Sequence, residues 1–346
     1  MVTAQGVGPQ QAPPGGPDWL RAPVDRWIVD CDPGIDDAAA LLAILGARRL
    51  GRPHALDVAG ITTVFGNVPL AQATRNALAV QELVGASVPV YPGASRALLE
   101  PPRHAREVHG QDGLGDVGLV AEPRRGAEAQ DGVSFIVEAA RRWGGRLGIL
   151  ALGPLTNLAL AVAWRREVAG AISRLVVMGG TSQARGNASA VAEFNVAADP
   201  EAAAVVFGAG IPTVIVPWET TVDAPLEEPF LRQLDACPAP AARFMAKAAR
   251  HIRDVERVLL GKELTVLPDL VAAAVAMQPE VAMQVVAARV EVETAGRVGR
   301  GLLALDTRPG AVANALVVLA VDRRRVGELL MEGACPPGRA AEVPAS

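Results

Sequence analysis

Lysine is almost missing from this chain. Lys247 and Lys262 are the only two among 33 basic residues, so arginine carries nearly all of the positive charge. The acidic residues number 37, which gives a formal net charge of −4. A balance this close to neutral provides no strongly basic surface for nucleic acid or for an anionic membrane. We therefore expect neither nucleic acid nor a membrane among the partners.

Long apolar runs and cysteine pairs are also scarce. No run of 18 residues is both apolar and free of charge, so we predict no membrane span. Cys31, Cys237 and Cys335 are odd in number and far apart, so we predict no disulfide framework and expect a reducing, cytoplasmic location. Residues 1–24 are rich in Gly, Pro and Gln and lack a basic segment with an apolar core. They predict a disordered tail and not a signal peptide.

What the chain does have is an alternation of strand and helix patterns. Short apolar runs predict buried strands at 56–64, 88–90, 147–152, 175–178 and 214–216. Helical spacing lies between and after them, at 69–83, 133–143, 158–164, 225–262, 270–277 and 325–331. We predict one doubly wound α/β domain over residues 25–333, with a largely parallel central sheet flanked by helices. Alternating residues within 282–321 predict small antiparallel strands, and residues 334–346 are expected to fray.

Four carboxylates lie within eight residues at the start of this domain. An apolar strand from Trp27 ends in Asp30 and Asp32, and Asp36 and Asp37 then open an apolar helix after a Pro-Gly turn. Like charges at close range are unfavourable unless a cation or a hydroxyl network compensates them. Oxygen ligands favour calcium or magnesium. The alternative is structural: two acids that complement a helix N-terminus and two that belong to turns.

Further polar residues follow later strands or fill two long irregular segments. Asn67 ends the second strand, and residues 96–128 carry His104 and His109 in a glycine-rich loop that is either functional or simply mobile. Residues 181–198 carry another group: Asn187, Glu193, Phe194 and Asn195. Because strand ends of a parallel sheet meet at one edge, these side chains and Asp269 are expected around one crevice. Acids and amides in this proportion suit a ligand rich in hydroxyl groups, such as a sugar.

Several motifs follow one another in a fixed order along the chain. They are Asp30-Cys31-Asp32-Pro33-Gly34-Ile35-Asp36-Asp37, Thr62-Thr63-Val64-Phe65-Gly66-Asn67, His109-Gly110, Asp112-Gly113-Leu114-Gly115, Leu152-Gly153-Pro154-Leu155-Thr156-Asn157, Met178-Gly179-Gly180, Glu193-Phe194-Asn195 and Asp199-Pro200-Glu201-Ala202. This ordered set resembles one enzyme family, the inosine-uridine preferring nucleoside hydrolases, and the resemblance runs from about residue 26 to residue 332.

The resemblance implies calcium-dependent hydrolysis of the N-glycosidic bond of a ribonucleoside to ribose and free base. Asp32 would act as general base on the metal-bound water, through an oxocarbenium-like transition state. The implied calcium ligands are Asp32, Asp37, the backbone carbonyl of Leu152, and Asp269. The residues that would hold the substrate are Asp36, Asn67, Asn187, Glu193, Phe194 and Asn195. The family also implies a homo-oligomer, a dimer or a tetramer.

The leaving-group acid is where the chain departs from the pattern. Members of the family often place a histidine before the last metal-ligating aspartate, and this chain has Pro268 there, which cannot donate a proton. His109 matches another active-site histidine of the family and is expected near the base, where it protonates or contacts it. His104 and His251 are expected at the surface. Trp218 is expected in the core.

Two other functions stay open. A non-catalytic protein that binds nucleosides or ribose would keep the pocket without turnover, which Pro268 allows. An aspartate-nucleophile phosphatase also begins with a strand and an Asp-x-Asp motif, but neither Lys247 nor Lys262 lies in a suitable loop. The preferred base, the tolerance of deoxyribose and the physiological role stay open as well.

Overall fold

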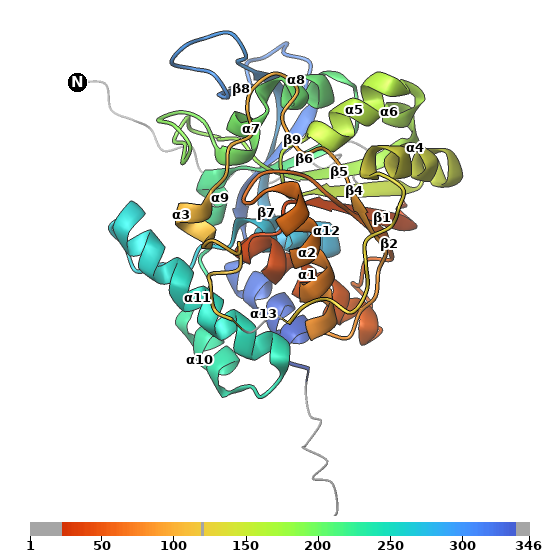
Figure 1. The fold of residues 1–346 in the computed structure, drawn as a ribbon. Helices are drawn as coiled ribbons and strands as arrows, with labels where there is room; N and C mark the ends of the chain where they lie inside the picture. Colours follow the sequence, from red (N-terminus) through yellow and green to blue (C-terminus); the bar gives the residue numbers. More distant parts are fainter. Residues whose placement is uncertain (1–22, 119–120, 337–346) are drawn as a thin grey trace, which may run out of the picture.

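The computed structural model describes residues 23–118 and 121–336, and its centre is one nine-stranded sheet (Figure 1). The strand order is β3-β2-β1-β4-β5-β6-β9-β7-β8. The strands are β1 (Arg26–Cys31), β2 (Val58–Thr63), β3 (Val90–Pro92), β4 (Leu147–Ala151), β5 (Ile172–Met178), β6 (Thr213–Val216), β7 (Ala282–Val292), β8 (Leu303–Asp306) and β9 (Ala315–Val321). The six strands from β3 to β6 pair in parallel.

Helices cover both faces of this sheet and build a separate apolar core on each. One core holds α1 (Ile35–Arg49), α2 (Leu70–Leu83), α10 (Glu228–Ala236), α11 (Pro240–Leu259), α12 (Pro268–Met277) and α13 (Arg323–Ala334). The other holds α4 (Gly132–Trp143), α5 (Thr156–Trp164), α6 (Glu167–Ala171) and α8 (Pro200–Gly208). The doubly wound prediction is therefore confirmed. No helix in the described part of the chain combines the length and the apolar character that a membrane crossing needs.

The C-terminal strands differ in one respect from the prediction. β7 runs antiparallel to both β8 and β9, as expected, but β9 also pairs in parallel with β6. It thereby joins the small antiparallel part to the main sheet. The alternating pattern identified the strands. Which strand each of them pairs with depends on the path of the chain back to the main sheet, and no local sequence pattern predicts that path.

Three short helices were not predicted. Two of them, α3 (Arg106–His109) and α7 (Phe194–Ala198), lie inside segments expected to be irregular, and α9 (Trp218–Val222) follows β6. Each spans four or five residues. A segment this short does not complete two turns, so hydrophobic periodicity cannot reveal it. The expected tails, residues 1–24 and 334–346, fall mostly outside the described residues. The described part of the second one includes the end of α13 and Cys335.

Helix α1 is the centre of the larger core. Every residue from Ile35 to Ala47 is buried, because the helix packs against α2, α11, α12 and α13. Its approach to α13 requires glycine: a Cβ on Gly46 would clash with the backbone of Gly333. The first turn of α1 carries Asp36 and Asp37, so this packing fixes both carboxylates in place.

The cysteine prediction is wrong at one point. Cys237, at the end of α10, and Cys335, after α13, form a disulfide with their Cα atoms 6.2 Å apart. They are 98 residues apart in sequence and become neighbours only because α10 packs on α13. Cys31 is the free, buried cysteine.

We expect the disulfide to stabilise the folded state by about 2–5 kcal/mol, because it restricts the unfolded chain. Urea denaturation with and without reducing agent measures this difference. Cys335→Ser is the control, since a reducing agent should not change its stability further. Thiol titration of the denatured, non-reduced protein should find one thiol per chain; finding three would contradict the bridge.

Candidate functional site

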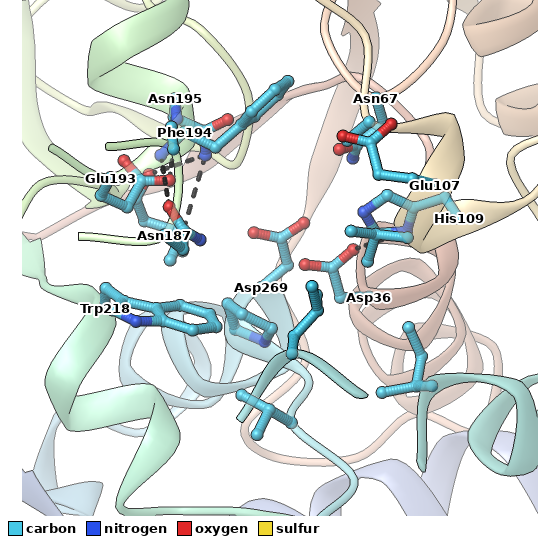
Figure 2. Close-up of a pocket in the computed structure, with 18 of the residues that line it drawn as sticks. Asp36, Asn67, Glu107, His109, Asn187, Glu193, Phe194, Asn195, Trp218 and Asp269 are labelled. Atoms are coloured by element: carbon cyan, nitrogen blue, oxygen red, sulfur yellow. Dashed lines mark hydrogen bonds and ion pairs between the residues drawn. The ribbon is translucent and has the colours of Figure 1, made fainter. Parts of the chain in front are cut away.

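A cavity of about 620 Å³ lies where the parallel strands end. Its lining comes from segments that directly follow β1, β2, β4, β5 and β6, together with α3, α11 and the start of α12. Figure 2 shows Asp36, Asn67 and His109 on one side of it and Asn187, Glu193, Phe194 and Asn195 on the other. The sheet thus brings together the residues that the sequence predicted around one crevice.

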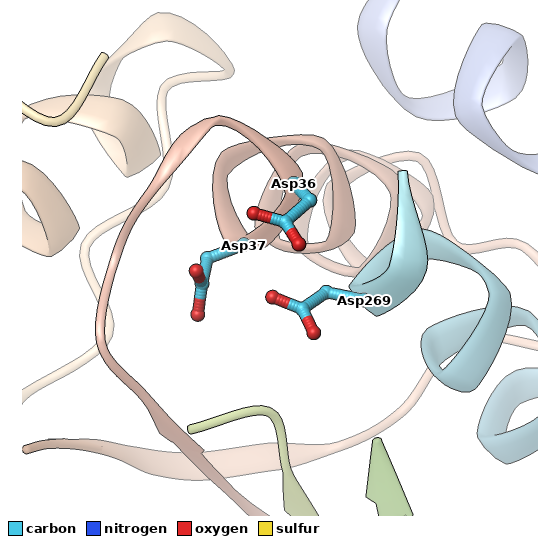
Figure 3. A group of neighbouring side chains, drawn as sticks. All are labelled: Asp36, Asp37 and Asp269. Atoms are coloured by element: carbon cyan, nitrogen blue, oxygen red, sulfur yellow. The ribbon is translucent and has the colours of Figure 1, made fainter. Parts of the chain in front are cut away.

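Three carboxylates meet at the floor of this cavity, where Asp36 and Asp269 line it and Asp37 is buried next to them. Asp36, Asp37 and Asp269 each contribute an oxygen, and these oxygens lie within 4.8 Å of one another (Figure 3). Asp36 and Asp37 belong to the first turn of α1, and Asp269 belongs to the first turn of α12. Two helix N-termini therefore point at the cluster, and their backbone N–H groups favour negative charge there.

Hydrogen bonds hold Asp37 in position. Its Oδ2 accepts from the backbone N–H of Gly34 at 2.9 Å and from Asn67 Nδ2 at 3.1 Å. Its Oδ1 accepts from the backbone N–H of Asp32 at 3.2 Å. The bond to Gly34 also closes the first turn of α1, since an acid at the third helical position reaches back to the N-cap. Asn67 is thereby tied to the cluster and does not stand alone at its strand end.

Asp32 is buried beside this cluster and is confined by backbone on two sides. Its Oδ2 accepts from the backbone N–H of Asn67 at 2.6 Å. A Cβ on Gly153 would lie 2.5 Å from Oδ1, and one on Gly66 would collide with Oδ2. Only glycine at these two positions leaves room for the carboxylate. Oδ1 itself is buried and has no hydrogen-bond partner among the described residues.

Burial and mutual repulsion raise the pKa values of these acids. Burial and the charge of Asp36 raise the pKa of Asp37 to about 7. Burial, followed by the neighbouring aspartates, raises the pKa of Asp32 and of Asp269 well above the usual range. Both effects disfavour the ionised forms in the protein alone. A bound cation would reverse this preference, because its charge stabilises the carboxylates.

The donor set fits a hard divalent cation. One oxygen each of Asp32, Asp36 and Asp269 is buried without a hydrogen-bond partner among the described residues. Such orphaned oxygens are costly unless a ligand pairs with them. All of the groups are oxygens, which suits calcium or magnesium. The carbonyl of Leu152 lines the same cavity and accepts from Asn195 Nδ2 at 2.7 Å, which leaves it a second lone pair.

The opposite wall is organised by Glu193. Its carboxylate accepts from the backbone N–H groups of Gly180 and Asn195, both at 2.8 Å, and of Val196 at 3.2 Å. Burial raises the pKa of Glu193 to about 7 although these donors oppose the shift. Asn187 Oδ1 accepts from the backbone N–H of Phe194 at 2.8 Å. These bonds hold in place the segment 187–196, in which the sequence predicted substrate-binding residues. Both Glu193 and Asn187 line the cavity.

His109 is buried and lines the cavity, where the sequence predicted it. Its Nδ1 accepts a hydrogen bond from the backbone N–H of Ile35, 3.2 Å away at the start of α1. Burial lowers the pKa of His109, although Asp36, whose Oδ1 is 3.8 Å from Nδ1, opposes the shift. The ring is therefore neutral near pH 7, and its proton resides on Nε2.

Two other histidines are not the exposed surface residues that we expected. His104 is half-buried, lines the cavity, and shares a hydrogen bond with the carbonyl of Gly66 at 2.9 Å. His251 lies on α11 and bonds the carbonyl of Val108 at 2.9 Å. This contact joins α11 to α3, the helix that carries His109. Sequence reasoning missed both because the partners are 38 and 143 residues away.

Three further residues are buried next to the site. Asp30 accepts from Thr62 and Asn157 and is not among the residues that line the cavity. Asp199 caps α8 and also accepts from Thr156 Oγ1 at 2.7 Å. Trp218 is buried, with 9% of its surface exposed, and it lines the cavity as well.

Among the lining residues that had not been predicted, Glu256 is a buried acid. It lies on α11 and is 95% buried, since only 5% of its surface is exposed. The apolar stripe of α11 contains a usable signal, because Met245, Ala248, Ala249 and Ile252 repeat at helical spacing and Glu256 takes the next position. An acid on the buried face of an amphipathic helix needs an explanation.

Comparison with known proteins identifies close relatives in sequence. The model of the inosine-uridine preferring nucleoside hydrolase family matches residues 27–328. The non-specific ribonucleoside hydrolase RihC of Salmonella heidelberg is 37% identical over 316 residues, which cover 90% of this chain and 98% of that protein. Uridine nucleosidase 1 of Arabidopsis thaliana is 38% identical over 232 residues, covering 66% of this chain and 67% of that one.

Solved structures agree with these matches. A plant nucleoside hydrolase superposes with a TM-score of 0.82 at 29% identity, covering 91% of this chain and 100% of that chain. The purine-preferring ribonucleoside hydrolase of Gardnerella vaginalis superposes with a TM-score of 0.81 at 29% identity, covering 89% of this chain and 98% of its own.

The confinement of Asp32 generates a prediction. Gly153→Ala should push the carboxylate aside and lower kcat/KM of the chain's activity by about 10²-fold, because small displacements of reacting groups are costly. The matched control is Gly179→Ala, whose Cβ would make an ordinary contact of 3.4 Å. Circular dichroism should show both variants folded. Equal activity of the two variants would contradict the steric argument.

Proposed function

The chain belongs to the inosine-uridine preferring nucleoside hydrolase family and is a ribonucleoside hydrolase, and we propose that its acidic cluster holds calcium and the ribose during hydrolysis. The observation that carries this proposal is the meeting of unpartnered carboxylate oxygens at the floor of one cavity. The names of the relatives differ in the base, from uridine to purine, so we propose the ribonucleoside class and not one base.

The sugar is proposed to lie over the cluster. Asp36 and Asn67 would contact it from the side of α1, and Asn187, Glu193 and Asn195 from the opposite wall. Carboxylates and amides match vicinal hydroxyl groups, because they accept and donate hydrogen bonds in pairs. The volume of about 620 Å³ is within the usual range for small-molecule sites.

Bond cleavage at C1′ places positive charge on the ribose ring. The surrounding carboxylates would stabilise this charge because they are fixed before the reaction begins. Asp32 would take a proton from the attacking water through Oδ1, the oxygen without a hydrogen-bond partner. Its other oxygen is already bonded to the backbone of Asn67, which keeps the acceptor in one orientation.

The proposed calcium ligands are Asp32, Asp37, the Leu152 carbonyl and Asp269. When bound, the cation would lower the pKa of a coordinated water and orient the sugar hydroxyls. Asp36 also contributes an oxygen to the cluster. Its carboxylate would therefore lie close to both the cation and the sugar.

The base is proposed to lie against the less polar part of the cavity. Val108 and Ile252 line the cavity from α3 and α11, and Phe194 and Trp218 line it from the side of Glu193. His109 would contact the base by donating from Nε2, since Nδ1 already accepts from Ile35. Homo-oligomeric assembly and a cytoplasmic location stay predictions.

A phosphatase function is not favoured by the cavity. Enzymes that use an aspartate nucleophile typically pair it with a lysine near the transferred phosphoryl group, and the described residues that line this cavity include no lysine; their one arginine, Arg103, is exposed. Both lysines of the chain, Lys247 and Lys262, lie outside it.

Incubation of the purified protein with inosine, uridine and a phosphate monoester distinguishes these functions. We expect release of reducing sugar from at least one nucleoside and no release of inorganic phosphate. Phosphate release would indicate the phosphatase. Saturable nucleoside binding without any sugar release would indicate a binding protein.

Replacement of Asp37 tests the metal site. Asp37→Ala should lower kcat/KM by about 10³-fold, because several kcal/mol of transition-state stabilisation are lost. Isothermal titration of the chelated protein with Ca²⁺ should show one site in the unmodified chain and none in the variant. Asp223→Asn, an exposed acid, is the control and should match the unmodified protein. Calcium binding that survives Asp37→Ala would contradict the proposed ligand set.

A further inference from the structure

Departure of the base needs a proton, and the structure narrows the choice of its donor. Pro268 stands directly before Asp269, where the family resemblance implied a histidine, and it suits that position because it is the first residue of α12. His109 accepts from Ile35 at Nδ1, so its ring is neutral. A neutral imidazole donates a hydrogen bond through Nε2 but is a weak proton donor. Another acid must protonate the base.

Glu256 is placed for this role. It lines the same cavity as Asp36, His109 and Asp269. It is carried by α11, which packs against α1 and α3, the helices that hold Asp36 and His109. Ile252 and Leu259 lie four residues before and three residues after it on the same helix face and line the cavity with it, and Val266 from the following loop is a further apolar lining residue. Glu256 therefore belongs to the apolar side of the cavity, where the base is proposed to lie, and not to the acidic floor.

The carboxyl group of Glu256 also lacks the partners that a structural acid would have. Its Oε2 is buried and has no hydrogen-bond partner among the described residues. The two other buried glutamates near the site differ: Glu193 accepts three backbone N–H groups, and Glu219 accepts from Ser182, Gln183 and Arg185. Burial, together with the charge of Asp36, raises the pKa of Glu256 to about 7. A substantial fraction of the Glu256 side chains is therefore protonated at neutral pH.

We propose that Glu256 is the general acid that protonates the departing base, in the place that Pro268 leaves vacant. This inference rests on the proposed orientation of the nucleoside, with its ribose on the acidic floor. A buried carboxylic acid without a competing partner can present its O–H to a ring nitrogen or a carbonyl oxygen of the base.

Two proton transfers accompany the cleavage of the glycosidic bond. The C1′–N bond breaks and its electron pair moves to the base, which takes the proton of Glu256. The oxygen of the attacking water bonds to C1′, and the proton it loses goes to Asp32. Asp32 then releases that proton to solvent, and Glu256 takes one up. The net reaction is ribonucleoside plus water to ribose plus base.

The test uses two leaving groups with the whole protein. Inosine and uridine need protonation of the base, whereas 4-nitrophenyl β-D-ribofuranoside releases a phenolate that leaves unaided. Glu256→Gln keeps the size of the side chain and removes the acid. We expect kcat for the better nucleoside to fall about 10²- to 10⁴-fold, the usual contribution of a general acid. Turnover of the nitrophenyl riboside should stay within about threefold, which also shows that the variant is folded.

Glu107→Gln is the matched control, because Glu107 also lines the cavity but is exposed on α3. It should match the unmodified protein on both substrates. If Glu256→Gln slows both substrates equally, or raises only KM for nucleosides, Glu256 is a structural or base-contacting residue and the proposal is wrong. Glu256→Asp keeps the acid and should retain more nucleoside turnover than Glu256→Gln; the reverse order would also overturn it. If the unmodified protein cleaves no nucleoside, the proposed function fails instead.

Discussion

The structure depends on how it accommodates buried negative charge. Asp32, Asp36, Asp37 and Asp269 are buried together, and the pKa values of Asp32, Asp37 and Asp269 are raised by burial and by their neighbours. A cluster of this kind is unfavourable for an isolated protein. Helix N-termini and backbone N–H groups offset part of the cost, and a bound cation with the hydroxyls of a sugar would offset the rest. In the proposed function, relief of this cost would favour the binding of a cation and a sugar.

The scaffold makes this arrangement possible through burial and not through local charge pairing. Helix α1 is enclosed on all sides, so the turn that carries Asp36 and Asp37 has little freedom to move away from Asp269 on α12. Gly66 and Gly153 leave space for the Asp32 carboxylate that any larger residue would fill. Preorganisation of this kind is what allows fixed charges to stabilise a transition state without further rearrangement.

The two sides of the cavity have different chemistry. The floor and the Glu193 wall consist of carboxylates and amides whose orientation is fixed by backbone donors. The side formed by α3 and α11 is more apolar and contains one neutral histidine and one unpaired acid, His109 and Glu256. This division suits a nucleoside, which has a hydroxyl-rich sugar at one end and a flat base at the other. In the proposed mechanism hydrolysis uses both sides, because the sugar becomes cationic while the base gains a proton.

The sequence by itself determined the class of fold and most residues of the floor. Apolar runs and helical spacing are local patterns, so they predict strands and helices directly from the sequence. The polar residues at the ends of these elements, such as Asp32, Asn67 and Asp269, could be recognised in the same way. Tertiary structure alone decided the rest. The pairing of β9 with β6, the bridge from Cys237 to Cys335 and the placement of Glu256 in the cavity each join segments that are far apart in the chain. Such contacts arise from the packing of whole elements, and the residues that make them carry no local mark of their partners.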